Sequence, residues 1–342
     1  MNIKKTKFSS FCMNGIAKGC KHCVLGKKLV LFVSGKCSRN CWYCSLSRKR
    51  KNKDVIYVNE RKCRKIKDLI QEIKESKSVG AGITGGDPLL SLNKTIKYAK
   101  AMKDNFRKKF HIHIYLPTKL VSKEKLRKLT EYIDEVRFHP EFLCSGKTED
   151  IEKIKLARLF FKKQNIGIEL PLLPDKKQEI LDFILQAKDF IGFVNLNELE
   201  LSDTNFDKMT KKYKLKQGGY VVSESKEAGL WILKNLEKRK IKLKIHLCTA
   251  ELKNCSQYKN RLLLHDILPF GKRTKDGSVI YIVINKKLKL KGTYYDKDKK
   301  RTILSEKTAR KLLNQANHGK HKIFRIEEFP TFDRIEIEKE EI

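Results

Sequence analysis

Three cysteines lie within eight residues of one another in the stretch GKCSRNCWYCSLS, residues 35–47. They are Cys37, Cys41 and Cys44, and the apolar run KLVLFVSG at residues 28–35 leads into them. Three thiolates on one loop can wrap one corner of a cubane iron–sulfur cluster and leave one iron without a protein ligand. A structural zinc site usually takes a fourth ligand close by. The spacing also differs from the ferredoxin run, in which cysteines ligate every iron.

A glycine-rich turn follows the next apolar run along the chain. The stretch ITGGDPLL, residues 83–90, contains Gly85, Gly86 and Asp87. Glycine has no Cβ, so its main chain can approach a ligand closely. The same residues are also ordinary chemistry for a turn between a strand and a helix. The turn is therefore a candidate ligand-binding loop.

The cysteine motif resembles that of the radical S-adenosylmethionine (SAM) superfamily, in which CxxxCxΦC, with Φ aromatic, follows the first strand of a (βα)6 barrel. The resemblance implies that Cys37, Cys41 and Cys44 hold a [4Fe-4S] cluster. The fourth iron would bind the amino and carboxylate groups of SAM. Tyr43 matches the aromatic residue whose neighbourhood packs on the adenine.

The glycine-rich turn resembles the GGE motif of the same superfamily, whose backbone oxygens receive the methionyl amino group of SAM. By this resemblance Gly85, Gly86 and Asp87 belong to the SAM site. Asp87 stands where the family usually has Glu. Because the contact is mainly from the backbone, we expect the replacement to be tolerated.

Within the superfamily the chain is most similar to the pyruvate formate-lyase activating enzymes, and especially to an archaeal branch with CxxC, ITGG, RFHP and NLNELE…TN elements. They occur here as CKHC, ITGG, RFHP and NLNELELSDTN. The resemblance implies that a ferredoxin- or flavodoxin-type donor reduces the site, and that cleavage of SAM gives a 5′-deoxyadenosyl radical for hydrogen abstraction. The substrate stays open between a partner protein, an RNA and a small metabolite, because kinship of fold does not name it.

Polar residues near the ends of later strands are candidates for further contacts with SAM. Members of the superfamily use such positions for the ribose hydroxyls and the carboxylate, which implicates His139, Glu169 and Asn197. Side chains alternate between the two faces of a strand, so only some of these positions point inward. His139 is equally compatible with a hydrogen-bonded core histidine, and the same ambiguity applies to His111 and His113.

A second group of cysteines precedes the first strand. Cys12, Cys20 and Cys23 lie in CMNGIAKGCKHC, and Cys248 and Cys255 follow the last strand of the series. Closing the barrel could bring Cys248 or Cys255 to the N-terminal thiols and complete a set of four. Such a set suits Zn²⁺ or an auxiliary iron–sulfur cluster. The alternative is that these are free thiols in a reducing compartment.

The composition is strongly basic, with 77 Lys and Arg against 40 Asp and Glu and a net charge of +37. Clustered cations can bind polyanions such as RNA, but lysine is spread through every segment, which a compositional bias also explains. We find no signal-peptide pattern and no apolar run long enough to span a bilayer, and we expect a cytoplasmic protein. The alternative to the enzyme is a zinc-binding, cysteine-rich RNA-associated protein without radical chemistry, which would hold zinc and no iron.

The elements that must position these residues alternate regularly along the chain. Short β-rich runs are separated by longer amphipathic stretches, a pattern that builds βαβ units and a parallel sheet. We predict an α/β fold with a partial (βα)6 radical SAM barrel, an N-terminal cysteine knuckle and a small C-terminal α+β appendage. The predicted domains are residues 1–27, the barrel with its closing strand and helix at 28–267, and the appendage at 268–342.

Overall fold

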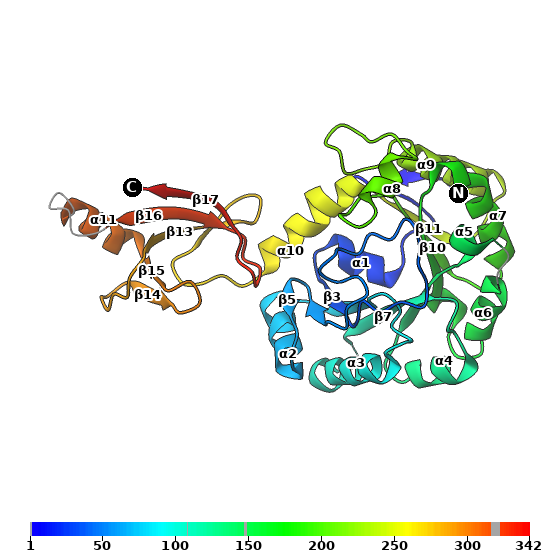
Figure 1. The fold of residues 1–342 in the computed structure, drawn as a ribbon, viewed down its shortest axis with the longest axis horizontal. Coiled ribbons are helices and arrows are strands. Elements are labelled where there is room, and N and C mark those ends of the chain that lie inside the picture. Colours follow the sequence, from blue (N-terminus) through cyan, green and yellow to red (C-terminus); the bar gives the residue numbers. More distant parts are fainter. Residues whose placement is uncertain (1, 108, 147–148, 316–321) are drawn as a thin grey trace. The chain divides into compact units, whose positions relative to one another are not determined.

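The computed structural model describes residues 2–107, 109–146, 149–315 and 322–342, which fall into two compact units (Figure 1). The first unit comprises Met1–Lys74 and Ser78–Gln257, and the second comprises Glu75–Lys77 and Tyr258–Ile342. The predicted boundary after residue 267 therefore lies inside the second unit. The N-terminal 27 residues belong to the first unit together with the barrel.

Parallel strands form the centre of an eleven-stranded sheet in the first unit. Their order in the sheet follows their order in the chain. They are β3 (Lys28–Phe32), β6 (Gly80–Thr84), β7 (His111–Pro117), β8 (Glu135–His139), β9 (Ile166–Pro171), β10 (Phe193–Asn197) and β11 (Lys244–Cys248). The α/β class predicted from the alternation and the partial barrel implied by the family resemblance are confirmed.

Short antiparallel strands extend the sheet at both edges. On one side β2 (Phe11–Met13) pairs with β11, and β1 (Lys4–Lys5) pairs with β2. On the other side β4 (Tyr57–Val58) pairs with β3, and β5 (Arg61–Lys62) pairs with β4. Within the described part of the chain the two edges do not pair with each other. The sheet is thus an open barrel.

Helices cover the outer face of the sheet and connect consecutive strands (Figure 1). Each presents apolar residues at three- and four-residue intervals to the sheet, as an amphipathic helix does; α7, for example, buries Ile180, Leu181 and Ile184. The connecting helices are α2 (Ile66–Glu75), α3 (Leu92–Phe106), α4 (Lys123–Leu129), α6 (Asp150–Ala157), α7 (Lys177–Ala187) and α9 (Ser225–Lys238). Shorter helical segments are α5 (Phe142–Ser145), α8 (Phe206–Thr210), the turns Lys163–Asn165 and Pro174–Lys176, and the π-helical turn Leu252–Tyr258.

One helix lies inside the barrel. The segment α1 (Lys18–Val24) contacts β3, β6 and β7 and is enclosed by the strands (Figure 1). Its Gly19 faces the interior so closely that a Cβ would lie 2.6 Å from His113 Nδ1 and 2.7 Å from Arg137 Nη2. The N-terminal cysteine segment therefore fills the barrel, which its short and polar sequence did not indicate.

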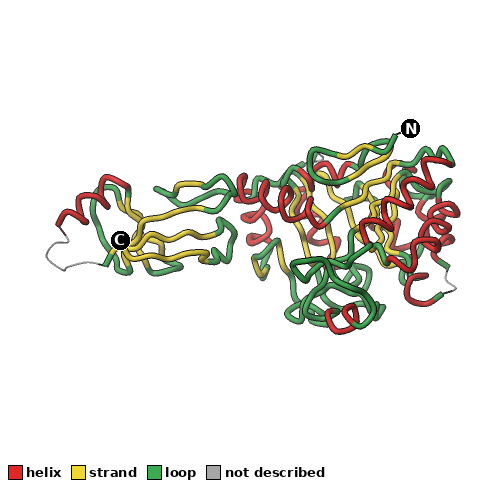
Figure 2. Tube along the Cα trace, turned by 90° about the horizontal axis from the view of Figure 1, so that it is seen from above, coloured by secondary structure: helices red, strands yellow, loops and turns green. Residues whose placement is uncertain are grey.

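Long loops gather at one end of the barrel strands (Figure 2). Parallel strands place their carboxyl ends at one edge of a sheet, and α/β barrels build their chemistry on the loops at that edge. Among the described residues, no helix combines the length and the apolar content that crossing a membrane requires.

The second unit is an antiparallel sheet with two helices. The strand order is β14 (Thr293–Asp296), β15 (Arg301–Leu304), β13 (Val279–Ile284), β16 (Ile323–Glu328) and β17 (Glu336–Glu341), and β12 (Lys272–Arg273) pairs with β13. The helices are α10 (Lys259–Leu264) and α11 (Glu306–Gln315). This is the predicted α+β appendage, with a meander followed by a helix and a strand-like tail. The sequence EKTARKLLNQAN predicts a helix over residues 306–317, of which residues 316–317 lie outside the described residues.

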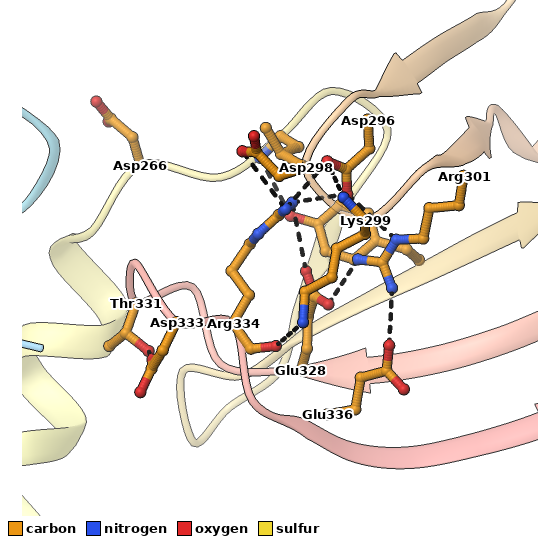
Figure 3. Close-up of polar contacts among 12 residues, drawn as sticks. Asp266, Asp296, Asp298, Lys299, Arg301, Glu328, Thr331, Asp333, Arg334 and Glu336 are labelled. Carbon is orange, nitrogen blue, oxygen red and sulfur yellow. Dashed lines mark hydrogen bonds and ion pairs between the residues drawn. The ribbon is translucent and has the colours of Figure 1, made fainter. Parts of the chain in front are cut away.

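A buried ion network holds this sheet together (Figure 3). The Arg301 side chain is 2% exposed and donates to Glu328 Oε2 at 2.6 Å, to Asp296 Oδ2 at 3.2 Å and to Glu336 Oε1 at 3.3 Å. Arg334 forms a two-pronged contact with Asp296 at 2.7 and 3.0 Å. Burial raises the pKa of Glu328, and the charge of Arg301 opposes that rise. Removing one cation would leave buried carboxylates uncompensated.

We predict that Arg301→Met destabilises the second unit by roughly 3–5 kcal/mol, because it breaks a buried pair from one side. The measurement is hydrogen exchange with mass spectrometry of the β13 amides in the full chain. Arg325→Met is the matched control: its partner Glu338 lies at 2.8 Å, but both side chains are partly or fully exposed, so the expected loss is below about 1 kcal/mol. Equal exchange in the two variants would contradict the role given to the buried network.

Candidate functional site

A cavity of about 380 Å³ opens at the carboxyl ends of the barrel strands. Its volume lies in the range of about 300–1,000 Å³ that small-molecule sites occupy. The loop after β3, the loop after β6 and the ends of the following strands line it. The sequence-predicted residues that line it are Cys37, Cys41, Cys44, Tyr43, Gly85, Gly86, His139, Glu169 and Asn197.

The cysteine loop is anchored to the next parts of the barrel by hydrogen bonds. The Arg39 guanidinium donates to the carbonyl oxygens of His139 at 2.7 Å and Pro140 at 2.9 Å. Asn205 Nδ2 donates to the carbonyl oxygen of Tyr43 at 3.0 Å. Neither anchor was predicted, because each joins residues about a hundred or more positions apart. The three thiols of the loop are free and half-buried.

The two glycines after β6 are required by the cysteine loop itself. A Cβ on Gly85 would lie 2.5 Å from the carbonyl oxygen of Ser34, and one on Gly86 would lie 2.3 Å from that of Lys36. The backbone also pairs there, since Gly86 N–H donates to Ser34 O at 2.8 Å. The two glycines therefore allow the backbone of the neighbouring cysteine loop to approach closely. Both glycines also line the cavity.

Asp87 lies beside the cavity rather than in its wall. Its carboxylate is fully buried and accepts hydrogen bonds from Ser38 Oγ at 2.6 Å and from Leu89 N–H at 2.9 Å. Burial raises the pKa of Asp87, and these hydrogen bonds oppose the rise. The residue fastens the glycine turn to the cysteine loop, a positioning role that the sequence comparison with GGE did not distinguish from ligand contact.

An additional thiol lies next to the cysteine motif. Cys144 shares a hydrogen bond with Cys41, and its Sγ donates to Tyr43 Oη at 3.4 Å. That hydrogen bond and burial raise the pKa of Cys41, whereas the pKa of Cys144 is lowered chiefly by the same bond. This neighbour could not be predicted from the sequence, because Cys144 follows β8 and lacks a motif partner.

His139 links the cysteine loop to β9. Its Nδ1 donates to the carbonyl oxygen of Glu169 at 3.1 Å, and its Nε2 accepts from Tyr43 Oη at 3.1 Å. Burial lowers the pKa of His139 to about 4. Both ring nitrogens of the neutral imidazole are thus used within the protein, so His139 positions Tyr43 and has no nitrogen left for a ligand.

Glu169 and Asn197 keep hydrogen-bonding capacity toward the cavity. Glu169 Oε1 accepts from Asn195 Nδ2 at 2.6 Å and from Asn197 Nδ2 at 2.7 Å, and Oε2 accepts from Arg137 at 3.1 Å. A carboxylate offers about four acceptor positions, so one remains on Oε2. Asn197 also accepts from Asn195 at 3.1 Å and retains one amide hydrogen.

The network continues below the cavity to a buried histidine. His246 Nδ1 donates to Asn195 Oδ1 at 2.8 Å, and His246 Nε2 accepts from Ser10 Oγ at 3.1 Å. Burial, with a smaller effect of Arg137, lowers the pKa of His246 to about 4. The amide of Asn195 is oriented by Glu169 on one side and by this neutral ring on the other.

Three of the upstream and downstream cysteines meet in a smaller cavity of about 160 Å³, lined by Cys20, Cys23 and Cys248. Cys12 lies on β2 and does not line it, and Cys255 is exposed. Within the described residues, no cysteine belongs to a set of three ligand atoms within 4.8 Å of one another. Thiolates on a single zinc converge at about 2.3 Å from the ion, so these thiols are not gathered as a closed zinc site.

For the thiols of the cysteine loop, the lack of convergence on one point does not argue against a metal cluster. Cysteines that ligate different irons of one cubane are held apart by the cluster itself, so Cys37, Cys41 and Cys44 need not converge on one point. What they share is one loop and one cavity wall. This arrangement leaves room for a multi-iron group between them and the glycine turn.

Comparisons with known proteins agree with the geometry. The sequence profile of the Radical SAM superfamily matches residues 31–145. A Methanocaldococcus jannaschii protein, provisionally named a glycyl-radical enzyme activating enzyme, is 36% identical over 293 residues, which cover 82% of this chain and 76% of that protein. The chain belongs to the radical SAM superfamily. It is an activating-enzyme-like radical SAM enzyme, and its family uses SAM and a [4Fe-4S] cluster.

Solved structures give more distant similarity. The enzyme anSMEcpe with bound AdoMet is 16% identical, with a TM-score of 0.41 over 74% of this chain and 72% of that one. The radical SAM methyltransferase TsrM from Kitasatospora setae is 12% identical, with a TM-score of 0.36 over 55% of this chain and 40% of that one. That alignment leaves more than half of the methyltransferase unmatched.

We predict that Gly86→Ala displaces the cysteine loop, because the new Cβ meets backbone that cannot rotate away. Overpacking of this kind costs roughly 1–3 kcal/mol. Hydrogen exchange of residues 35–46 should become faster. Gly219→Ala is the control: it meets no atom within 4 Å, although its φ of +74° adds local strain, and it should leave exchange of the cysteine loop unchanged. Unchanged exchange in Gly86→Ala would show that the close approach is not a constraint.

The buried neutral histidines predict a loss of barrel stability in acid. Unfolded histidine titrates near pH 6.5, whereas His139 and His246 in the folded barrel have pKa values of about 4. Between these values the unfolded chain binds more protons, so the free energy of unfolding falls as the pH falls from about 6.5 to about 4. Urea unfolding followed by tryptophan fluorescence measures it, because both tryptophans, Trp42 and Trp231, lie in the barrel unit.

The variant His246→Gln removes one of these proton-linked groups. It should be less stable than the original chain at pH 7 and show a shallower dependence on pH between 6.5 and 4. An unchanged slope would mean that His246 does not stay neutral in the folded barrel.

Proposed function

We propose that Cys37, Cys41 and Cys44 hold a [4Fe-4S] cluster and that SAM occupies the 380 Å³ cavity beside it. The observation that carries this proposal is that three free thiols of one loop share a cavity wall with the glycine turn. Burial raises the pKa of the Cys37 thiol, and a bound cation reverses that preference by stabilising the thiolate. When bound, the cluster supplies the electron for reductive cleavage of SAM.

The side chains around the cavity have distinct tasks in this proposal. Glu169 has one acceptor position free, which suits a ligand hydroxyl such as that of a ribose, and Asn197 has one amide hydrogen to donate. Glu169, pinned by Arg137 and two amides, is oriented before any ligand arrives, which lowers the ordering cost of binding. His139 and Asp87 act on the ligand only through Tyr43 and the cysteine loop.

For the substrate, we infer a partner protein on which the enzyme acts by hydrogen abstraction, with a small redox protein of the ferredoxin or flavodoxin type as donor. The support is the name of the M. jannaschii relative. The residues up to Gln257 are about three quarters of the chain, so a match over 82% of it includes part of the second unit. The appendage is therefore partly shared with that relative.

We predict that Cys41→Ala abolishes iron binding and the dithionite-driven conversion of SAM to 5′-deoxyadenosine. The chain is purified without oxygen, reconstituted with iron and sulfide, and analysed for about four irons and for the nucleoside product. Cys63→Ala is the matched control, since Cys63 is a buried thiol bonded to Lys65 O and Tyr98 Oη on another face of the barrel, and it should retain both.

A sample that takes up no iron and leaves SAM intact would overturn the proposal and favour the RNA-associated alternative. Retention of iron and product in Cys41→Ala would instead show that the ligands have been misassigned. If SAM is cleaved but a candidate partner protein acquires no organic radical by electron paramagnetic resonance, the inference about the substrate fails while the proposed cofactor chemistry stands.

A further inference from the structure

A second set of ligand-type side chains lies inside the barrel at the opposite end of the strands from the cavity. His111 is the first residue of β7, and His113 follows two positions later on the same face of the strand. Glu135, the first residue of β8, is directly opposite His113 in the sheet register. One ligand atom from each of these three residues lies within 4.8 Å of the others. Residues 111 and 135 are 24 positions apart, and only the parallel pairing brings them together.

All three side chains are removed from solvent. The exposed fractions are 3% for His111, 1% for His113 and 2% for Glu135. Yet among the residues that the structure describes, neither ring nitrogen of His111 or His113 has a hydrogen-bond partner, and Nε2 of His22, on α1, is also without one. Leaving a buried polar group unsatisfied costs about 1–3 kcal/mol. Five such nitrogens in one place are an unusual concentration in a folded core.

The other buried histidines of the barrel provide the comparison. His139 and His246 are equally enclosed, and each uses both ring nitrogens in hydrogen bonds within the protein. The chain therefore satisfies a core imidazole where the ring has a structural task. The bare nitrogens of His111 and His113 point to a partner that is not a protein group.

The surrounding charges orient these side chains as a ligand set. Arg137 contacts only one oxygen of Glu135, Oε1, at 2.6 and 2.7 Å. Oε2 faces His111 Nε2 at 3.7 Å. On the other side of the same ring, Asp134 Oδ2 lies 3.9 Å from His111 Nδ1. Both distances are too long for hydrogen bonds, so the two carboxylates flank the His111 ring without occupying its nitrogens.

We propose that His111, His113 and Glu135 bind a divalent transition-metal ion of the zinc class; the His22 ring of α1 borders that of His111 but lies outside this ligand set. Two imidazoles and one carboxylate are a known protein ligand set for Zn²⁺, and imidazole suits the neighbouring metals as well. The His22 and His111 ring centroids are 5.6 Å apart, and those of His111 and His113 are 5.7 Å apart.

Glycines make the space in which the rings sit. A Cβ on Gly82 of β6 would lie 2.6 Å from His113 Nε2, and one on Gly19 of α1 would lie 2.6 Å from His113 Nδ1. Any larger residue at either position would fill the volume beside the ring nitrogens. Because Gly19 of α1 lies against His113 and its N–H donates to Glu135 Oε2 at 3.4 Å, an ion that fixes these two side chains would also hold α1 inside the barrel. The site is independent of the cysteine loop and of the proposed radical chemistry.

The test uses the full chain with Cys37, Cys41 and Cys44 all changed to Ala, so that no iron–sulfur cluster interferes. After chelator treatment, the protein is titrated with Zn²⁺, desalted and analysed for bound metal. We expect one zinc per chain, and X-ray absorption at the zinc edge should show only nitrogen and oxygen ligands at about 2.0–2.1 Å. A shell containing sulfur at about 2.3 Å, or no retained zinc, would overturn the proposal.

Variants in the same background separate the two candidate sites. His113→Gln should weaken zinc binding more than tenfold and speed hydrogen exchange of α1 to the level of the metal-free protein. Cys20→Ser/Cys23→Ser and His246→Gln, which alter interior groups outside the ligand set, should keep one zinc. Loss of zinc in the cysteine variant, or full retention in His113→Gln, would assign the metal elsewhere. The absorption measurement needs no histidine variant, so it decides even if His113→Gln fails to fold.

Discussion

The barrel depends on one buried cation, the guanidinium of Arg137. It lies between two carboxylates on neighbouring strands, Glu135 at 2.6 Å and Glu169 at 3.1 Å, and it also donates to Cys20 Sγ at 3.3 Å. A buried charge is tolerable only when it is paired and hydrogen-bonded. Here the pairing has a geometric effect, because Glu135 belongs to the histidine cluster at one end of the strands and Glu169 to the cavity at the other.

Glycines on one strand set the second constraint. The alternation GAG in β6 faces HIH in β7 in register, so that Gly80 and Gly82 lie beside His111 and His113. Immediately after the same strand, Gly85 and Gly86 admit the backbone of the cysteine loop. The glycines of β6 therefore contribute little side-chain packing at either end of the strand. The stability of this part of the sheet comes from the aliphatic residues of the neighbouring strands and from the outer helices. The small residues of β6 are explained by the histidine rings of β7 and the cysteine loop, which lie against them.

Much of this architecture could be predicted from the sequence, because the signals were local. The alternation of apolar runs and amphipathic stretches gave the parallel strands, and CxxxCxxC with GGDP placed two loops at one cavity. The contacts that could not be predicted from the sequence join residues that are far apart in the chain. The short polar segment containing Cys20 and Cys23 carries no periodicity that marks an interior helix. Cys144 belongs to no motif that would link it to Cys41. A histidine in an apolar strand also has the same sequence context whether its ring nitrogens are hydrogen-bonded, as in His139, or lack a described partner, as in His113.

The two groups of interior ligands differ in the chemistry that a metal would meet. Burial raises the pKa of the Cys20 thiol to about 12, and its sulfur is engaged by Arg137 and Asn195. A cation would have to displace a proton and compete with a guanidinium already hydrogen-bonded to that sulfur. Within the described part of the chain, the ring nitrogens of His111 and His113 have no hydrogen-bond partner, and the nearby Glu135 has one oxygen turned away from Arg137. The same buried arginine therefore competes with a cation at the thiols, whereas Glu135 Oε2, which accepts a long hydrogen bond from Gly19 N–H at 3.4 Å, is turned toward the histidines.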